Sequence, residues 1–395
     1  MTIAATITLK KGKEVSIQRF HPWIFSGAIQ RTEGKVEDGC WVGVQDYKGN
    51  ALGFGHFQQG SITVRLLDFG ALAPGENFWQ NKIQQAVTTR QSMNIPSSST
   101  NAYRLVHGEG DGLPGLIVDM YNGVAVVQAH SAGMHTDRTR IVDGLRQVLG
   151  GTLHAVYYKS KGTLPGSLRG GESEEYLFGM GAVPHGVLEN DLKFYVDWEE
   201  GQKTGFFLDQ RDNRNLLAHY VKGKQVLNTF CYTGGFSVYA LAGGATAVHS
   251  VDASEKAIAL TRQNIALNGY DSGINECFCD DVFHYLENNP QQYDVIVLDP
   301  PAFAKHKDAR HQAVKGYQRL NAEAIKLIKP GGIIFTFSCS QVIDRSLFYN
   351  TVVSSAIVAN RQVKVLHHLT QGPDHPVSMF HPEGEYLKGL VLYVS

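Results

Sequence analysis

The chain has 395 residues, of which 43% are hydrophobic and 18% charged, and this balance allows large packed cores and excludes wholesale disorder. The formal net charge is −1, so binding to nucleic acid would have to come from local basic patches. The sequence lacks an apolar stretch of about 18 residues and a signal-peptide layout at its start. We therefore expect a cytoplasmic protein of two or three domains with no membrane contact.

Five cysteines, at positions 40, 231, 277, 279 and 339, include no C-x-x-C pair. This odd and dispersed set argues against a disulfide framework and against a structural zinc site, so we expect no metal. Cys277 and Cys279 lie two apart in an expected strand, and we interpret them as small core residues that share one face.

The first region, residues 1–72, is predicted to form a small β-barrel. Short strands are expected at 41–45, 52–56 and 62–66, with a turn at 47–50. Several short strands at this spacing, separated by glycine turns, are typical of a barrel.

The second region, residues 73–190, mixes helical and strand patterns and is predicted to be a small α+β domain. Helices are expected at 76–93 and 137–149, and strands at 116–118, 124–127 and 155–158. A Pro/Ser stretch at 96–100 indicates a loop, and the piece rich in glycine and charge at 162–175 is expected to be a mobile loop.

The third region, residues 191–395, alternates strands with helices. Strands are expected at 225–227, 248–251, 277–279, 295–298 and 333–337, and helices at 236–241, 254–268 and 313–328. This alternation, with nearly continuous apolar strands, predicts a mostly parallel, doubly wound sheet covered on both faces.

Ligands of such a sheet bind beyond the C-terminal ends of its strands. The turn Asn228-Thr-Phe-Cys-Tyr-Thr-Gly-Gly-Phe236 allows a close backbone approach, Asp252 can accept hydrogen bonds from ribose hydroxyls, and Asp281 with Val282 can hold an adenine. The G-x-G-x-x-G pattern of dinucleotide binding is absent, and Asp-Pro-Pro at 299–301 has no role there. These features favour S-adenosylmethionine over NAD. An inert α/β fold with incidental acidic residues is the other interpretation.

A thiol follows the last expected strand at the same sheet edge as Asp299, because Cys339 stands in Phe-Ser-Cys-Ser. Cytosine C5 is too weak a nucleophile to attack a methyl sulfonium unless a thiolate first adds to C6. Cys339 is the candidate nucleophile, although a small residue turning a strand into a loop would look the same. Asp299 would act on the N3/N4 edge of the base, which requires a raised pKa or a shared proton.

Three further assignments stay open at this point. Lys305 can lower the thiol pKa or hold a phosphate, or it can be a solvated loop charge. Cys231, near the glycine turn, is a second candidate nucleophile. The base that removes the C5 proton is not identified. The target base must be single-stranded or flipped out, and the basic segment 305–311 would then contact phosphates or lie exposed.

The motifs at 202–214, Tyr-Thr-Gly-Gly-Phe, Asp-Pro-Pro-Ala-Phe and Phe-Ser-Cys-Ser together resemble the ribosomal RNA large-subunit cytosine-5 methyltransferase family over nearly the whole chain. The resemblance implies an N-terminal PUA β-barrel that binds RNA, a middle domain at 73–190, and a Rossmann-like class I methyltransferase domain at 191–395. It also implies a homodimer and large-subunit ribosomal RNA as partner.

The resemblance and the strand-end positions together give a set of expected site residues. The predicted catalytic residues are Cys339, Asp299 and Lys305. The predicted cofactor contacts are Gln210, Arg214, Asn228, Phe230, Tyr232, Thr233, Gly234, Gly235, Asp252, Ala253, Ser254, Asp281, Val282, Asp299 and Pro300. Two other functions are kept open: N-methylation of a guanine or adenine, since Asp-Pro-Pro lies near Phe303, and RNA binding without catalysis.

Overall fold

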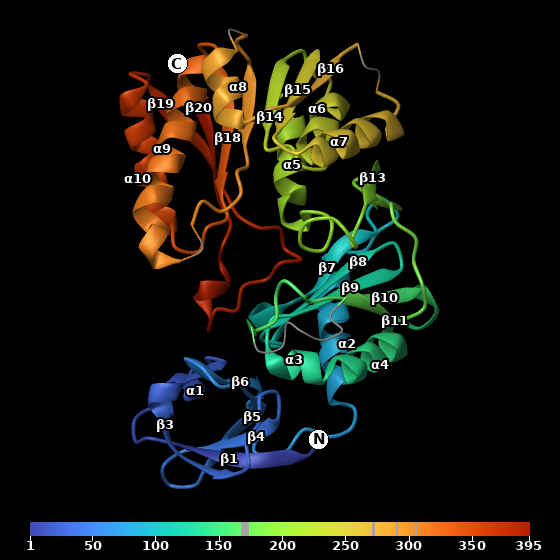
Figure 1. Cartoon of the computed structure of the whole chain (residues 1–395), viewed down its shortest axis with the longest axis vertical. Coiled ribbons are helices and arrows are strands. Elements are labelled where there is room, and N and C mark those ends of the chain that lie inside the picture. The colour runs from blue at the N-terminus through green and yellow to red at the C-terminus, as the bar shows by residue number, and fades with distance from the viewer. Residues whose placement is uncertain (167–173, 271–272, 290, 305) are drawn as a thin grey trace. The chain divides into compact units, whose positions relative to one another are not determined.

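The computed structural model describes residues 1–166, 174–270, 273–289, 291–304 and 306–395 (Figure 1). The chain divides into two compact units. The first unit comprises residues 1–187, 196–208 and 373–384, and the second comprises 188–195, 209–372 and 385–395. The predicted barrel and middle regions therefore fall in one unit, and the predicted boundary at 190/191 falls in the turn of a hairpin, between β12 (His185–Glu189) and β13 (Leu192–Val196).

The N-terminal part of the first unit is a six-stranded sheet in the order β2-β6-β5-β4-β1-β3. Its core holds buried aliphatic side chains, including Ile7, Val42 and Val64. The three strands expected from the pattern are present as β4, β5 and β6. The strands are β1 (Ile3–Leu9), β2 (Trp23–Phe25), β3 (Ile29–Gly34), β4 (Trp41–Gln45), β5 (Ala51–Phe57) and β6 (Ile62–Asp68), with a short helix α1 (Val15–Gln18).

A second, five-stranded sheet of the same unit has the order β11-β10-β9-β8-β7. Helices α2 and α4 pack against one another closely enough that a Cβ on Gly144 would lie 2.8 Å from Cδ1 of Ile83. The elements are α2 (Phe78–Gln91), β7 (Ala102–His107), β8 (Leu116–Tyr121), β9 (Val124–Ala129), α3 (Ala132–Thr136), α4 (Arg138–Leu149), β10 (Ala155–Lys159) and β11 (Glu174–Phe178).

The loop expected at 162–175 was wrong at its C-terminal end, because Glu174 and Glu175 begin β11 and pair with β10. The middle of that loop, residues 167–173, lies outside the described residues.

Residues 373–384 belong to the first unit although they follow most of the second unit in sequence. The carboxylate of Asp374 accepts a hydrogen bond from the Arg104 backbone N–H at 3.1 Å, and its carbonyl accepts one from Nη2 of Arg90 at 3.0 Å. A Cβ on Gly110 would lie 1.9 Å from the carbonyl oxygen of Pro376. This returning segment, 373–384, is therefore packed tightly against the first unit.

The second unit is built on a seven-stranded sheet in the order β16-β15-β14-β17-β18-β20-β19. Strands β14 to β18 pair in parallel, and β20 is antiparallel to both of its neighbours. The doubly wound sheet is confirmed, and its strand order reverses between β14 and β17. The strands are β14 (Gln225–Thr229), β15 (Ala247–Asp252), β16 (Asn275–Cys279), β17 (Val295–Leu298), β18 (Gly332–Ser338), β19 (Val363–Leu369) and β20 (Lys388–Val394).

Two groups of helices accompany this sheet (Figure 1). The neighbours α5 and α6, and α6 and α7, contact one another, as do α8 and α9, and α9 and α10. The helices are α5 (Arg211–Ala218), α6 (Gly235–Ala242), α7 (Glu255–Leu267), α8 (Val282–Asn288), α9 (Arg310–Leu327) and α10 (Arg345–Val358). Among the residues described, no helix combines the length and apolar character that a bilayer crossing requires.

The prediction that Cys277 and Cys279 are core residues was wrong, because Cys277 is half-buried and Cys279 is exposed. Both stand on β16, which is an edge strand of the seven-stranded sheet and so has a neighbour on one side only. The pattern predicted the strand but not its place at the edge.

Candidate active site

The turn after β14 has an unusual backbone. Phe230 and Tyr232 have φ angles of 54° and 47°, and Gly234 has 76°. Positive φ at bulky residues costs energy and is concentrated at functional sites. The turn is held in place because Cys231 N–H donates to the Val251 carbonyl at 3.1 Å. The turn therefore presents its backbone at the switch point of the sheet, where ligands of this fold bind.

Asp252, the last residue of β15, is oriented by the backbone around it. One carboxylate oxygen accepts a hydrogen bond from Tyr232 N–H and the other accepts one from Ser254 N–H, both at 3.0 Å. Each oxygen keeps further lone-pair capacity, so the carboxylate can still accept the two hydroxyls of a ribose. Ser254 also caps α7 through its hydroxyl, and Ala253 is exposed between the two.

Asp281 caps α8, with its carboxylate accepting the His284 N–H at 3.0 Å. Val282 is buried in the core beneath it. The carboxylate itself is exposed, which leaves it open to a ligand.

Asp299 follows β17 beside the β14 turn, since Thr229 pairs with Leu298. Its carboxylate accepts a hydrogen bond from Nε2 of Gln210 at 3.0 Å, and Oε1 of Gln210 in turn accepts one from Asn213 at 2.6 Å. Burial, and then the nearby carboxylate of Asp209, raise the pKa of Asp299 to about 7. A carboxyl with this pKa can hold a proton near neutral pH and can therefore act as a proton donor. Pro300 is buried next to it.

Cys339 follows β18 and is half-buried. The next residue, Ser340, donates its hydroxyl hydrogen bond to the carbonyl of Ala304 at 2.6 Å, which ties the cysteine loop to the loop that begins at Asp299. The structure thus brings the Asp-Pro-Pro-Ala-Phe and Phe-Ser-Cys-Ser motifs together at one sheet edge.

A lysine that the sequence reasoning missed lies beside this thiol. Lys388 begins β20 opposite Ser338 and is 4% exposed. Its ammonium donates hydrogen bonds to the carbonyls of Ser340 at 2.7 Å and Tyr386 at 2.6 Å. Burial lowers the pKa of Lys388 to about 8, and the charge of Cys339 opposes that shift. Its signal in the sequence was a lone lysine in the apolar run Tyr-Leu-Lys-Gly-Leu-Val-Leu-Tyr.

The remaining expected site residues lie around the β14 turn, except for one that lies outside the described residues. Arg214 is buried, and its Nε and Nη2 donate to Glu189 at 2.8 and 2.7 Å. A Cβ on Gly235 would lie 3.0 Å from Cδ of Arg214, so this ion pair supports the start of α6. The Asn228 amide donates to Ser237 at 2.8 Å, and the carbonyl of Thr233 accepts from Asn264 at 2.8 Å. Lys305 lies outside the described residues.

Cys231 has a poorer environment for nucleophilic chemistry than Cys339. Its thiol is buried and lies 3.5 Å from the Thr261 hydroxyl, and burial raises its pKa well above the ordinary value. A thiol held neutral in this way reacts slowly.

A family model for S-adenosylmethionine-dependent methyltransferases matches residues 103–378, and a model for PUA-like domains matches residues 7–69. The chain therefore belongs to the S-adenosylmethionine-dependent methyltransferases, and the donor set around the β14 turn and Asp252 fits that cofactor. Several relatives are named ribosomal RNA large subunit methyltransferase I. The one from Pseudoalteromonas atlantica is 39% identical over 99% of this chain and 100% of its own length. The one from Aeromonas hydrophila is 40% identical over 99% of both chains. The chain is a member of this ribosomal RNA large subunit methyltransferase I family.

Solved structures agree on the fold. A protein from Streptococcus mutans described as a SAM-dependent methyltransferase has a TM-score of 0.83 at 24% identity, covering 99% of this chain and 100% of its own. A methyltransferase solved in complex with SAH has a TM-score of 0.84 at 24% identity, with the same coverage. The predicted architecture, a PUA-like N-terminal domain followed by a class I methyltransferase fold, is confirmed.

Proposed function

We propose that this enzyme methylates C5 of a cytosine in large-subunit ribosomal RNA, with the thiolate of Cys339 as the nucleophile. The observation that carries the proposal is the position of three residues at one edge of the sheet: Asp299 follows β17, Cys339 follows β18, and Lys388 begins β20 opposite Ser338. The family relatives act, by their name, on ribosomal RNA of the large subunit.

The chain's own residues have distinct tasks in this chemistry. The Cys339 sulfur forms a bond to C6 of the base, and the electron pair of the C5–C6 double bond is displaced toward the N3 side, where protonated Asp299 supplies a hydrogen bond or a proton. When bound, S-adenosylmethionine supplies an electrophilic methyl group for the activated C5. Loss of the C5 proton to a base then re-forms the double bond and expels the Cys339 thiolate.

We infer for Lys388 the effect on the thiol that was also expected of Lys305, which lies outside the described residues. A buried ammonium next to a thiol favours the thiolate and so lowers its pKa. The carbonyls of Ser340 and Tyr386 hold the ammonium in place without neutralising its charge. These two hydrogen bonds use two of its three N–H donors.

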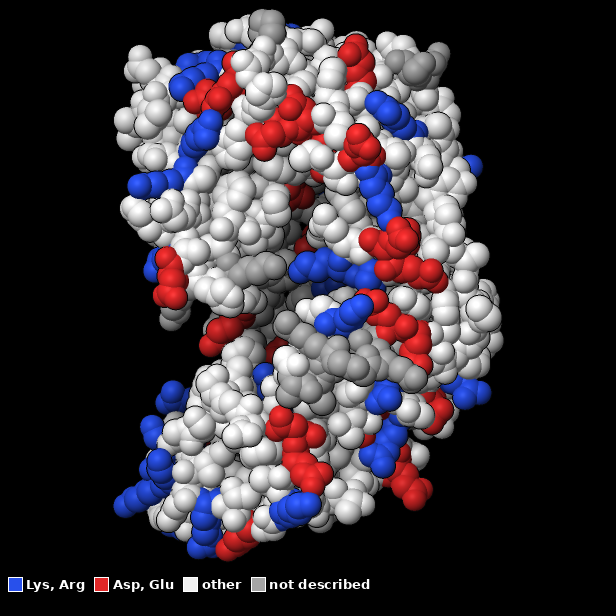
Figure 2. Space-filling model, in the orientation of Figure 1, with Lys and Arg blue, Asp and Glu red and all other residues white. Residues whose placement is uncertain are grey.

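Support for RNA binding comes from the N-terminal domain. A concave surface on it is lined by Lys10, Lys11, Gln30 and Tyr47. The Nζ atoms of Lys11 and Lys48 lie 5.9 and 5.5 Å from the centroid of the Tyr47 ring. Figure 2 shows basic side chains along one edge of the lobe formed by β1 to β6. Cations next to an exposed aromatic ring suit phosphates and bases together. The homodimer and the cytoplasmic location stay predictions.

The test is covalent trapping. Large-subunit ribosomal RNA containing 5-fluorocytosine is incubated with the protein and S-adenosylmethionine, because fluorine at C5 prevents the elimination that releases the enzyme. We expect a denaturation-resistant protein–RNA adduct, mapped by mass spectrometry to Cys339, that is absent from Cys339→Ala and present in Cys279→Ala. Methylated RNA with no adduct, together with full activity of Cys339→Ala, would indicate N-methylation. Failure to bind S-adenosylmethionine at all would indicate an RNA-binding protein without catalysis.

A further inference from the structure

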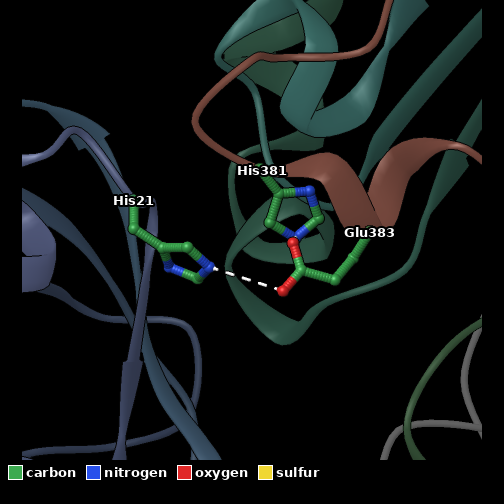
Figure 3. A group of neighbouring side chains, drawn as sticks. All are labelled: His21, His381 and Glu383. Atoms are coloured by element: carbon green, nitrogen blue, oxygen red, sulfur yellow. Dashed lines mark ion pairs between the residues drawn. The ribbon is translucent and has the colours of Figure 1, made fainter.

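A cluster of three possible metal ligands lies in the first unit, in residues that the methyl-transfer chemistry does not use (Figure 3). His21 follows α1 in the N-terminal domain, and His381 and Glu383 lie on the returning segment, the latter in a short 3-10 turn (Pro382–Gly384). Nε2 of His21 is 3.9 Å from Oε1 of Glu383, and Nε2 of His381 is 3.7 Å from Oε2. One ligand atom from each residue lies within 4.8 Å of the other two.

His381 is the observation that points to a ligand. Its side chain is 3% exposed, and neither ring nitrogen has a hydrogen-bond partner within the described part of the chain. Leaving buried polar atoms unpaired is costly, and native structures rarely do so without a reason. The ring is fixed by the Trp23 indole at 4.3 Å between ring centroids and by His21 at 5.4 Å. Figure 3 shows its ring turned toward Glu383.

We propose that His21, His381 and Glu383 bind a divalent transition-metal ion of the zinc type, with water as the remaining ligand. Two imidazoles and a carboxylate are a common donor set for zinc, and imidazole ligation separates this class from calcium and magnesium. Tetrahedral bonds of about 2.0–2.2 Å place neighbouring ligand atoms about 3.4 Å apart. The nitrogen–oxygen separations of 3.9 and 3.7 Å end on the two different oxygens of the Glu383 carboxylate and exceed this value by a few tenths of an ångström, so tetrahedral coordination needs a small side-chain adjustment.

The adjustment needed on binding falls on side chains that can move. Glu383 is 55% exposed and His21 is 20% exposed, whereas buried His381 stays in place. Coordination through Nε2 puts the proton of His21 on Nδ1, so the 3.2 Å hydrogen bond that Nδ1 accepts from Trp23 N–H is given up. That bond is long, and a metal–imidazole bond replaces it.

Such an ion would join two parts of the chain that are far apart in sequence. Asp374 and Pro376 already attach one end of the returning segment to the middle part of the first unit. An ion held by His381, Glu383 and His21 attaches the other end to the N-terminal domain. Since the ligands come together only in the folded unit, binding the ion stabilises that unit.

The experiment uses the full chain without an affinity tag, treated with a chelator and then titrated with Zn²⁺ by calorimetry. Co²⁺ is the spectroscopic probe, since its visible absorption reports tetrahedral imidazole and carboxylate ligation. We expect one ion per chain and quenching of Trp23 emission by Co²⁺ that a Trp23→Phe variant lacks. We expect affinity to fall roughly a hundredfold in His381→Gln and Glu383→Gln.

The matched control is His284→Gln: His284 also pairs with a carboxylate, Asp280, at 2.9 Å, but among the described residues it belongs to no group of three possible metal ligands. Its Zn²⁺ affinity is expected to equal that of the unsubstituted chain. Exposed Glu383→Gln keeps the test valid if buried His381→Gln fails to fold. The proposal is overturned if micromolar Co²⁺ gives no visible spectrum with the full chain, or if both ligand variants, His381→Gln and Glu383→Gln, bind metal as tightly as the unsubstituted chain. None of these readouts depends on methyl transfer.

Discussion

The proposed methyl-transfer site and the proposed metal cluster are assembled in opposite ways. In the second unit, Asp252 ends a parallel strand and Asp299 and Cys339 each directly follow one, so the sheet itself brings them to one edge. In the first unit, His21 and the pair His381 and Glu383 come from opposite ends of the chain and meet only because a segment returns. A site that follows strand ends can be read from a local pattern, whereas a site made by a returning segment cannot.

The largest expected effect is the loss of methyl-transfer activity when Cys339 is replaced, and its absence would contradict the placing of the site at the strand ends. We expect Cys339→Ala to reduce methyl transfer by roughly 10³-fold or more, because the proposed mechanism needs the sulfur adduct at C6 to make C5 nucleophilic. The measurement is incorporation of labelled methyl groups into large-subunit ribosomal RNA. Cys231→Ala serves as the control that separates the two candidate thiols, and loss of activity there alone would move the nucleophile to the β14 turn.

The next effect concerns cofactor binding at the end of β15. Asp252→Ala is expected to weaken S-adenosylhomocysteine binding roughly a hundredfold in calorimetry, since charged hydrogen bonds to the ribose and the anchor of Tyr232 N–H are both lost. Asp280→Ala removes a nearby carboxylate that pairs with His284, and it should bind normally. If Asp252→Ala bound S-adenosylhomocysteine as tightly as the unsubstituted chain, the assignment of Asp252 as a cofactor contact from its position at the end of β15 would be wrong.

A smaller effect would sharpen the role of the lysine that only the structure identified. Lys388→Met should raise the thiol pKa of Cys339 and slow its alkylation near neutral pH by about tenfold, while Lys388→Arg should restore part of the rate. The rate is followed across pH by mass spectrometry of the Cys339 peptide. Lys329→Met is the control, because Lys329 pairs with Asp294, before β17 rather than after it. An unchanged alkylation profile in Lys388→Met would assign this lysine to structure only.

The smallest effect is on stability. The Asp299 carboxyl has a pKa of about 7 in the folded protein against an ordinary value of 3.8, so between these values the folded state holds a proton that the unfolded state has lost. Stability then falls as pH rises through this window. Asp299→Asn lacks this dependence and should be more stable at pH 8 by about 1 kcal/mol, with no gain at pH 4. Denaturant unfolding at both pH values measures the difference, and an equal gain at both would contradict the shift.

Much of the second unit was predictable because its chemistry is local. The strands β14, β15, β17 and β18 and the helices between them have continuous apolar runs bounded by turn residues, and the fold prediction from them is confirmed. The assignment of Asp299 as a group needing a raised pKa agrees with its environment. Strands β19 and β20 were missed, although β20 carries Lys388, since an apolar run alone does not say where a strand pairs.

Less of the first unit was predictable because its contacts are long-range. Strand β1 pairs in parallel with β4 and antiparallel with β3, and neither partner can be inferred from alternation within β1. The returning segment has no regular pattern, so its place in the first unit came only from the structure. The expectation that no metal binds rested on the cysteines alone and did not consider histidines at opposite ends of the chain.

The path of the chain from β19 to β20 has a consequence for how the protein can be made and divided. After Leu369 the chain leaves the large sheet, contributes residues 373–384 to the other unit, and comes back to begin β20 at Lys388. The chain thus reaches β20, whose first residue pairs with Ser338 next to Cys339, only after this excursion. No single cut of the polypeptide separates the two units. A fragment that contains the second unit alone must therefore keep residues 373–384 without the first-unit surface on which they pack, or end before β20 and lose Lys388.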